Sequence, residues 1–245
     1  RALVLKYDAV ARDMDDHSLK YAAKYFKVAV DDRAILTPEQ IKESFFNNRE
    51  LFMNYFENDV REAYLVFEKL YIRYYYMQFI LPFQLTYEDL YCISTAALWE
   101  RILKTYYPKT YYEILKADDK FDYDGGFVLN NSGLYENVYK IDISSMYPNI
   151  MLNYQIHSIK DINKVMLGLL KAFTQKRLEL KKKAKDGDET ANLIQESLKI
   201  LINSAYGYLG TSGYKFNDMV AAAGVTAYGR AILKHMIQFI EARGG

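Results

Sequence analysis

A short β-prone run ends on an acidic residue in the stretch 139–151, which reads YKIDISSMYPNIM. Ile141 and Ile143 favour an extended strand around Asp142, and Pro148 is expected to stop any regular element a few residues later. Asp142 would then lie where a strand gives way to a turn, with backbone N–H groups free to face an anion. This position suits a metal-bound phosphate, although an Asp beside two serines can also simply cap the turn.

A second stretch, residues 199–207 with the sequence KILINSAYG, carries polar side chains at helical spacing. Lys199 and Asn203 are four residues apart and Tyr206 is three further on, so all three lie on one helical face. Gly207 opens a gap in that face.

Together the two stretches resemble the motifs of family B DNA polymerases. The family has Asp, two residues, Ser, one residue, Tyr-Pro in the palm, then Lys, three residues, Asn-Ser, one residue, Tyr-Gly in the fingers. Both patterns are complete here and in the family's order. Three further stretches agree in order: Tyr55 with Asp59, the Tyr-x-Gly-Gly run at 123–126, and the VTAYGR run at 225–230.

The resemblance implies template-directed DNA synthesis, in which a dNTP is joined to a primer 3′-hydroxyl with two Mg²⁺ ions, or with Mn²⁺ as an alternative. Asp142 and Lys199 would be the catalytic residues, and Asp142 would bind metal together with the Ile143 carbonyl. Tyr147 would pack beneath the deoxyribose and exclude ribonucleotides. The expected dNTP-binding residues are Ser145, Met146, Tyr147, Arg177, Lys181, Lys199 and Asn203. The base-pair pocket would be lined by Tyr206 and Gly207.

Two of the other motifs imply further sites. Tyr55 and Asp59 resemble the third motif of the linked 3′–5′ proofreading exonuclease, in which Asp59 would bind metal and Tyr55 would position water; an ordinary solvated Asp is the alternative. One carboxylate cannot hold two metals, so this chain alone is not expected to hydrolyse DNA. The resemblance assigns the single-stranded template to Tyr123, Gly125 and Gly126, whereas the residues alone fit a plain hairpin turn equally well.

Hydrophobic spacing and capping residues predict a largely helical chain. Leu19, Ala22, Ala23 and Phe26 recur at helical spacing, and Thr37-Pro38 is typical of a helix start. The expected helices are 49–79, 93–104, a hairpin with arms 160–185 and 189–206 around a turn at 186–188, and 219–242. The first hairpin arm carries the cations Lys171, Lys176, Arg177, Lys181, Lys182, Lys183 and Lys185. Such a run is either a solvated face or, with Lys199, a binding site for an anion.

The implied fold class is α+β and helix-rich. It comprises a partial palm sheet with a two-helix fingers hairpin, preceded by the helical end of a ribonuclease H-like exonuclease domain. The expected divisions are the C-terminal part of the exonuclease domain at 1–80, a connector at 81–122, the first part of the palm at 123–162, the fingers hairpin at 163–210, and a palm helix at 211–245.

Composition sets few further limits. The chain has 245 residues and a net charge of +1, so any surface for nucleic acid must be local. A single cysteine, Cys92, gives no disulfide or zinc pattern, and no run of membrane-spanning length or signal peptide is visible, which favours an intracellular protein without membrane contact.

Because Arg1 is not an initiator Met, we expect a piece of a longer protein, with the second palm carboxylate beyond Gly245 and no activity in the piece alone. Primer–template DNA, dNTPs and a processivity factor are the implied partners.

Two substitutions depart from the family pattern, Met146 for Leu and Asn149 for Ser, and the short connection from Pro148 to Arg177 favours a nucleic-acid-primed enzyme. Two other interpretations stay open. One is a polymerase relative without catalysis that serves as a DNA-binding or scaffold subunit. The other is an unrelated helical interaction protein whose motifs arose by chance.

Overall fold

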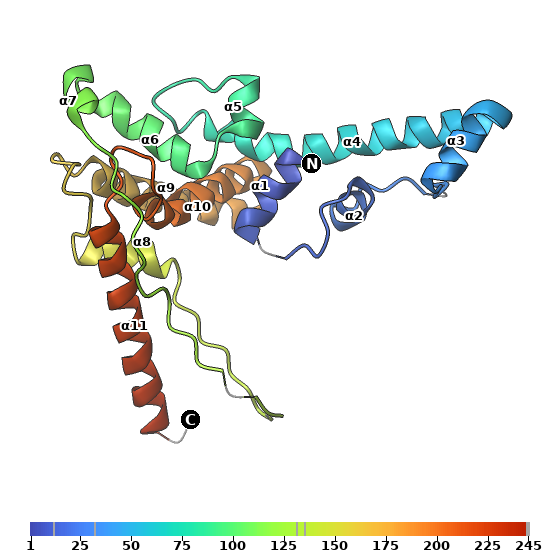
Figure 1. Cartoon of the computed structure of the whole chain (residues 1–245). Helices are drawn as coiled ribbons and strands as arrows, with labels where there is room; N and C mark the ends of the chain where they lie inside the picture. Colours follow the sequence, from blue (N-terminus) through green and yellow to red (C-terminus); the bar gives the residue numbers. More distant parts are fainter. Residues whose placement is uncertain (12, 32, 131, 135, 244–245) are drawn as a thin grey trace. The chain divides into compact units, whose positions relative to one another are not determined.

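The computed structural model describes residues 1–11, 13–31, 33–130, 132–134 and 136–243. They form α-helices joined by turns and irregular segments (Figure 1). The chain divides into two compact units, residues 1–93 and 94–245, each of which is considered by itself. No helix formed by the described residues is long and apolar enough to cross a membrane.

The first unit is built around one long helix, α4. Its helices are α1 (Ala2–Ala11), α2 (Leu19–Tyr25), α3 (Pro38–Asn47), α4 (Arg49–Met77) and α5 (Tyr87–Cys92). Val66, Leu70, Tyr74 and Met77 of α4 are buried and recur at helical spacing, and α4 contacts all four other helices of the unit. Thr37 forms the expected N-cap, since its side chain accepts a hydrogen bond from the Gln40 N–H.

The second unit packs its helices around α10. Its helices are α6 (Thr95–Tyr106), α7 (Lys109–Ile114), α8 (Met146–Asn153), α9 (Val165–Lys185), α10 (Glu189–Leu209) and α11 (Met219–Glu241). Helix α10 contacts α6, α8, α9 and α11. Trp99 of α6 is fully buried, and its indole N–H donates to the Leu201 carbonyl of α10 at 3.0 Å. This core holds α8, α10 and α11 around the candidate site.

The predicted helical hairpin is confirmed as α9 and α10, which turn at residues 186–188. Helix α9 begins later than expected because residues 158–164 form turns. The buried Asp161 carboxylate accepts hydrogen bonds from the N–H groups of Val165 and Met166, both at 2.9 Å. These bonds satisfy the first-turn donors and define where α9 starts.

Two expectations about the stretch around Asp142 are corrected. In the described residues no β-strand is formed, so the expected palm sheet is not seen. Tyr139 and Ile141 are 90% and 64% exposed, and a strand requires a hydrogen-bonded neighbour that this segment does not have. The prediction that Pro148 stops regular structure was wrong, because Pro148 lies in the first turn of α8, where its missing N–H costs nothing.

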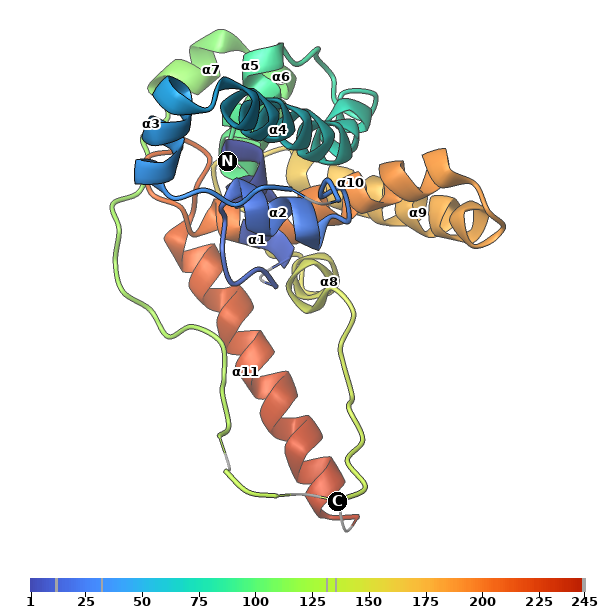
Figure 2. The ribbon, with the colours of Figure 1, turned by 90° about the vertical axis from the view of Figure 1, so that its right-hand side faces the viewer.

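An irregular excursion joins α7 to α8. Its described residues, 115–130, 132–134 and 136–145, contain neither helix nor strand. In Figures 1 and 2 it runs alongside α11 and returns to the start of α8. Both the predicted template-contacting residues and Asp142 lie on this excursion.

Glu100 is a buried charged residue that ties several segments of the second unit together. One carboxylate oxygen accepts from the Tyr112 hydroxyl at 2.8 Å and the Lys215 N–H at 3.0 Å. The other accepts from the Tyr208 hydroxyl and the Phe216 N–H. Burial and the hydrogen bond to Glu100 raise the pKa of Tyr112 to about 12. The carboxylate therefore satisfies four donors that would otherwise be left without partners in a protein interior.

We expect Glu100→Ala to lower the free energy of unfolding by about 3–5 kcal/mol, because several buried donors lose their acceptor at once. Urea unfolding of this chain, followed by the fluorescence of its single tryptophan, Trp99, measures the loss. Glu179→Ala is the matched control. Glu179 is exposed and lies 3.9 Å from Lys176, and a surface ion pair of this kind contributes little to the free energy of unfolding. Equal stability of the two variants would contradict this account of Glu100.

Candidate active site

A hollow of about 420 Å³ lies where the end of the excursion meets α8, α10 and α11. Its lining residues are Ile141, Asp142, Ile143, Ser145, Met146, Tyr147, Pro148, Asn203, Leu233 and Met236. The structure therefore brings Asn203 of the second motif together with seven neighbouring residues of the first, about 60 positions earlier in the sequence.

The start of α8 forms one side of this hollow. Ser145 precedes the helix in the left-handed conformation, with φ 47° and ψ 50°, and makes no side-chain cap. The amide of Asn149 donates to the Ser144 carbonyl at 2.8 Å and secures the turn. The first-turn N–H groups of Met146 and Tyr147 have no partner within the helix, and they lie at its positive end. Such a helix start can bind an anionic group such as a phosphate.

Asp142 contributes an exposed carboxylate to the hollow. Among the described residues, no three His, Cys, Asp or Glu side chains come together as a metal cluster. Mg²⁺ is often bound by one or two carboxylates, with water and substrate phosphates completing its shell. The Asp142 carboxylate and the Ile143 carbonyl are hard oxygen donors of this kind, so they fit as part of such a shell.

Tyr147 is half-buried and packs against Tyr206 of α10, with ring centroids 4.5 Å apart and an interplanar angle of 50°. The Tyr206 hydroxyl lies 3.4 Å from the Tyr123 hydroxyl. Burial is the larger cause and this hydrogen bond the smaller cause that raise the pKa of Tyr206 above its usual value. Three predicted site residues from three segments are thus in one chain of contacts.

The predicted cations lie on the helical hairpin but do not line the hollow. Arg177 and Lys199 are each eleven residues from Asp188 at the turn, so they lie at one level of the antiparallel pair. Lys181 is about one helical turn nearer the hairpin turn. Lys199 is one turn before Asn203, which does line the hollow. Convergence of the three cations on one anion stays a prediction.

The segment with Tyr123, Gly125 and Gly126 is bonded to α11. The Thr226 hydroxyl donates to the Asp124 carbonyl at 2.9 Å. The Arg230 guanidinium donates to the Asp124 carbonyl at 2.5 Å and the Gly125 carbonyl at 2.8 Å. From the sequence, Thr226 and Arg230 were predicted only as part of a palm helix. Their spacing of four residues, which places them on one helical face, was the available signal.

Helix α11 also supplies Leu233 and Met236 to the hollow, and the sequence analysis missed both. They follow Gly229 at intervals of four and three residues, so all three share one face of α11. This periodicity identifies a common face but does not reveal which partner the face meets.

The predicted exonuclease residues lie on α4 in the first unit. Asp59 forms an ion pair with Arg33, and the buried Glu62 pairs with the same guanidinium. The Arg33 guanidinium also lies 5.8 Å from the centroid of the Tyr55 ring. A metal ion at Asp59 would have to displace this guanidinium, so the residues as placed do not fit a metal site. The exonuclease role of Tyr55 and Asp59 stays a prediction.

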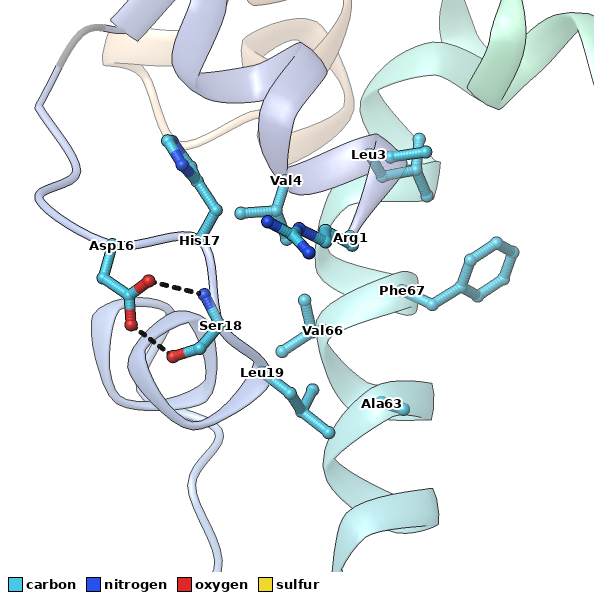
Figure 3. Close-up of a pocket in the computed structure, with 11 residues that line it drawn as sticks. Arg1, Leu3, Val4, Asp16, His17, Ser18, Leu19, Ala63, Val66 and Phe67 are labelled. Carbon is cyan, nitrogen blue, oxygen red and sulfur yellow. Dashed lines mark hydrogen bonds between the residues drawn. The ribbon is translucent and has the colours of Figure 1, made fainter.

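A different hollow, of about 710 Å³, lies in the first unit between α1, the start of α2 and α4 (Figure 3). Its walls are mainly apolar, with Leu3, Val4, Leu19 and Val66 among them. Its acidic group, Asp16, accepts a hydrogen bond from the Ser18 N–H at 3.1 Å. Neither predicted exonuclease residue lines it, and it offers no group that the chemistry of the sequence motifs requires.

The fold is that of part of a family B DNA polymerase. The structure of the family B DNA polymerase from the hyperthermophilic archaeon Pyrobaculum calidifontis matches with a TM-score of 0.73 and 24% sequence identity. The match covers 96% of this chain and 36% of that chain.

Sequence comparisons find similarity to the same family. Residues 157–245 match the family described as DNA polymerase family B. A DNA polymerase of Archaeoglobus fulgidus is 30% identical over 148 residues, and one of Thermococcus gorgonarius is 31% identical over 150 residues. Each alignment covers 50% of this chain and 19% of the relative. Residues 157–245 are therefore similar to DNA polymerase family B, and the chain spans about a fifth of the length of the curated relatives it matches.

Proposed function

We propose that the complete protein carries out template-directed DNA synthesis, transferring a nucleotide from a dNTP to a primer 3′-hydroxyl. The observation that carries this proposal is the hollow in which Asp142, the start of α8, Tyr147 and Asn203 meet. A carboxylate for a cation and an anion-binding helix start lie side by side there. The similarity of residues 157–245 to DNA polymerase family B supports the same reaction.

Asp142 and the Ile143 carbonyl would hold Mg²⁺, or Mn²⁺, in this proposal. Bound metal would lower the pKa of the primer hydroxyl and neutralise the departing pyrophosphate. The N–H groups at Ser145 and Met146 would hold the triphosphate at the start of α8. Additional positive charge would come from Arg177, Lys181 and Lys199, of which Lys199 is the proposed catalytic residue.

The remaining residues would set the geometry of the substrates. Tyr147 would pack under the deoxyribose, so that a 2′-hydroxyl has no space. Asn203 would contact the dNTP, with Tyr206 and Gly207 beside the nascent base pair. The single-stranded template would lie against Tyr123, Gly125 and Gly126. The proposed partners are therefore primer–template DNA and dNTPs, with a processivity factor in addition, in an intracellular setting.

The proposed divisions of the chain follow the same family. They are the end of an exonuclease domain at 1–80, a connector at 81–122, the first part of the palm at 123–162, the fingers at 163–210 and a palm helix at 211–245. A linked proofreading exonuclease in the complete protein belongs to this proposal. Because Arg33 pairs with Asp59, we assign no hydrolytic step to residues of the first unit.

Primer extension by the complete protein tests the proposed reaction. With Mg²⁺ and all four dNTPs, we expect a labelled primer to be extended to the end of its template. EDTA should stop extension and excess Mg²⁺ should restore it, because the metal neutralises charge in the transition state. Tight binding of primer–template DNA with no extension under any of these conditions would contradict the proposal and indicate a DNA-binding relative without catalysis.

A further inference from the structure

Two glycines from different elements approach the Tyr147 side chain. A Cβ atom at Gly126, on the excursion, would lie 3.1 Å from the Tyr147 hydroxyl oxygen. A Cβ atom at Gly229, on α11, would lie 3.1 Å from Cε1 of the same ring. Both separations are tighter than ordinary van der Waals contact, which spans 3.4–4 Å. With a side chain at either site, the Tyr147 ring or the glycine backbone would have to shift by a few tenths of an ångström.

A third neighbour completes the enclosure of this ring. Tyr206 packs on Tyr147 from α10, with the ring centroids 4.5 Å apart. Helix α11, helix α10 and the excursion thus each limit the movement of Tyr147. Tyr147 also lines the hollow, together with Asp142 and Asn203.

The excursion is anchored at this point, so Gly126 cannot simply retreat. Thr226 and Arg230 together donate three hydrogen bonds to the carbonyls of Asp124 and Gly125, directly before Gly126. Two of these bonds come from a guanidinium, which makes stronger hydrogen bonds than a neutral donor. A methyl group added at Gly126 must therefore displace the Tyr147 hydroxyl more than the backbone.

We propose that Gly126 and Gly229 are specificity-determining residues that set sugar selectivity by fixing how far Tyr147 extends into the hollow. The proposal rests on the proposed function, in which Tyr147 excludes the 2′-hydroxyl. A methyl group at either glycine pushes the ring toward the hollow and narrows the space for any sugar. The ribose of a ribonucleotide, which carries one oxygen more, loses more from this narrowing than a deoxyribose.

The test measures kcat/KM for single-nucleotide insertion of a dNTP and of the matching ribonucleotide by the complete protein. Gly126→Ala and Gly229→Ala should each raise the preference for the dNTP about three- to tenfold, as expected for a modest steric overlap. The KM for the dNTP should rise as well. Gly224→Ala is the control for α11, because a Cβ there meets no atom within 4 Å. The Gly224→Ala variant gains the same helix propensity as Gly229→Ala, and its sugar selectivity should stay within about twofold of that of the unsubstituted protein.

A double-mutant cycle with Tyr147→Phe separates the two contacts. Gly126 faces the hydroxyl oxygen whereas Gly229 faces a ring carbon. Combining Gly126→Ala with Tyr147→Phe should therefore remove the effect of the added methyl, while the effect of Gly229→Ala should persist in the same background. A folding defect would not be relieved by loss of one hydroxyl, so this pattern distinguishes a local contact from general damage.

Unchanged or lowered selectivity in both glycine variants would overturn the inference, because the ring would then not be pushed into the hollow. Loss of selectivity in Tyr147→Ala together with such a result would leave the proposed role of Tyr147 intact. Unchanged selectivity in Tyr147→Ala would instead overturn that role, and with it the inference.

Discussion

Asp142→Asn should abolish primer extension by the complete protein without loss of DNA binding. Asn has nearly the same shape as Asp but lacks the charge, and the Asp142 side chain is exposed, so little packing changes. We expect the extension rate to fall by at least about 1,000-fold, because an ion held at the reacting oxygens supplies several kcal/mol of charge stabilisation. Single-turnover extension and fluorescence anisotropy with labelled primer–template measure the two properties separately.

Asp186→Asn is a matched control for this change. Asp186 is also exposed and lies at the turn of the helical hairpin, away from the hollow. The same loss of one negative charge there should leave the extension rate within about twofold, since exposed charges away from a site are largely screened. A similar rate for Asp142→Asn and Asp186→Asn would remove Asp142 from the proposed metal site.

Tyr147→Ala should increase ribonucleotide incorporation about 100-fold relative to dNTP incorporation. A pocket that rejects a substrate with one added hydroxyl discriminates against it by about this factor. The ring lies between Tyr206 and the hollow, so its loss opens space at the position proposed for the sugar. Competition between each dNTP and its ribonucleotide, with alkaline cleavage of the product, counts the ribonucleotides inserted.

Two further variants make this measurement specific. Tyr147→Phe keeps the ring and should keep most of the selectivity. Tyr154→Ala removes another tyrosine at the far end of α8, whose ring stacks on Tyr228 with centroids 4.1 Å apart. It should leave selectivity unchanged, because Tyr154 does not line the hollow. If Tyr147→Ala and Tyr154→Ala discriminate equally well, the steric role of Tyr147 is wrong.

Local signals in the sequence predicted the long helices, whereas α5, α7 and α8 were not anticipated. The N-cap at Thr37 and the helix starts at residues 49 and 219 depend on neighbouring residues, and all three appear as expected. The stretch around Asp142 was harder, because strand formation depends on a partner rather than on the β-propensity of Ile141 and its neighbours. Pro148 was misread because proline is compatible with the first turn of a helix as well as with its end.

The candidate site could be predicted only in part for a similar reason. Ser145 and Tyr147 lie within a few residues of Asp142, so one motif places them together. Leu233 reaches the same hollow from α11, and the pairing of Arg33 with Asp59 joins a loop to a helix. Contacts of this kind are set by tertiary packing, which a periodic pattern along one helix cannot specify.

In the hairpin of α9 and α10, the length of each arm sets where its cationic side chains lie. Gly187 has a φ of 98° at its turn, a conformation that few other residues adopt easily, so the point of reversal is fixed. Arg177 and Lys199 are each eleven residues from Asp188, so the length of each arm sets the level of its cation along the pair. One residue added to a single arm would turn one cation away by about 100°, whereas about seven added to both arms would return both to the same side. In this hairpin, the lengths of the arms are therefore as informative as the side chains they carry.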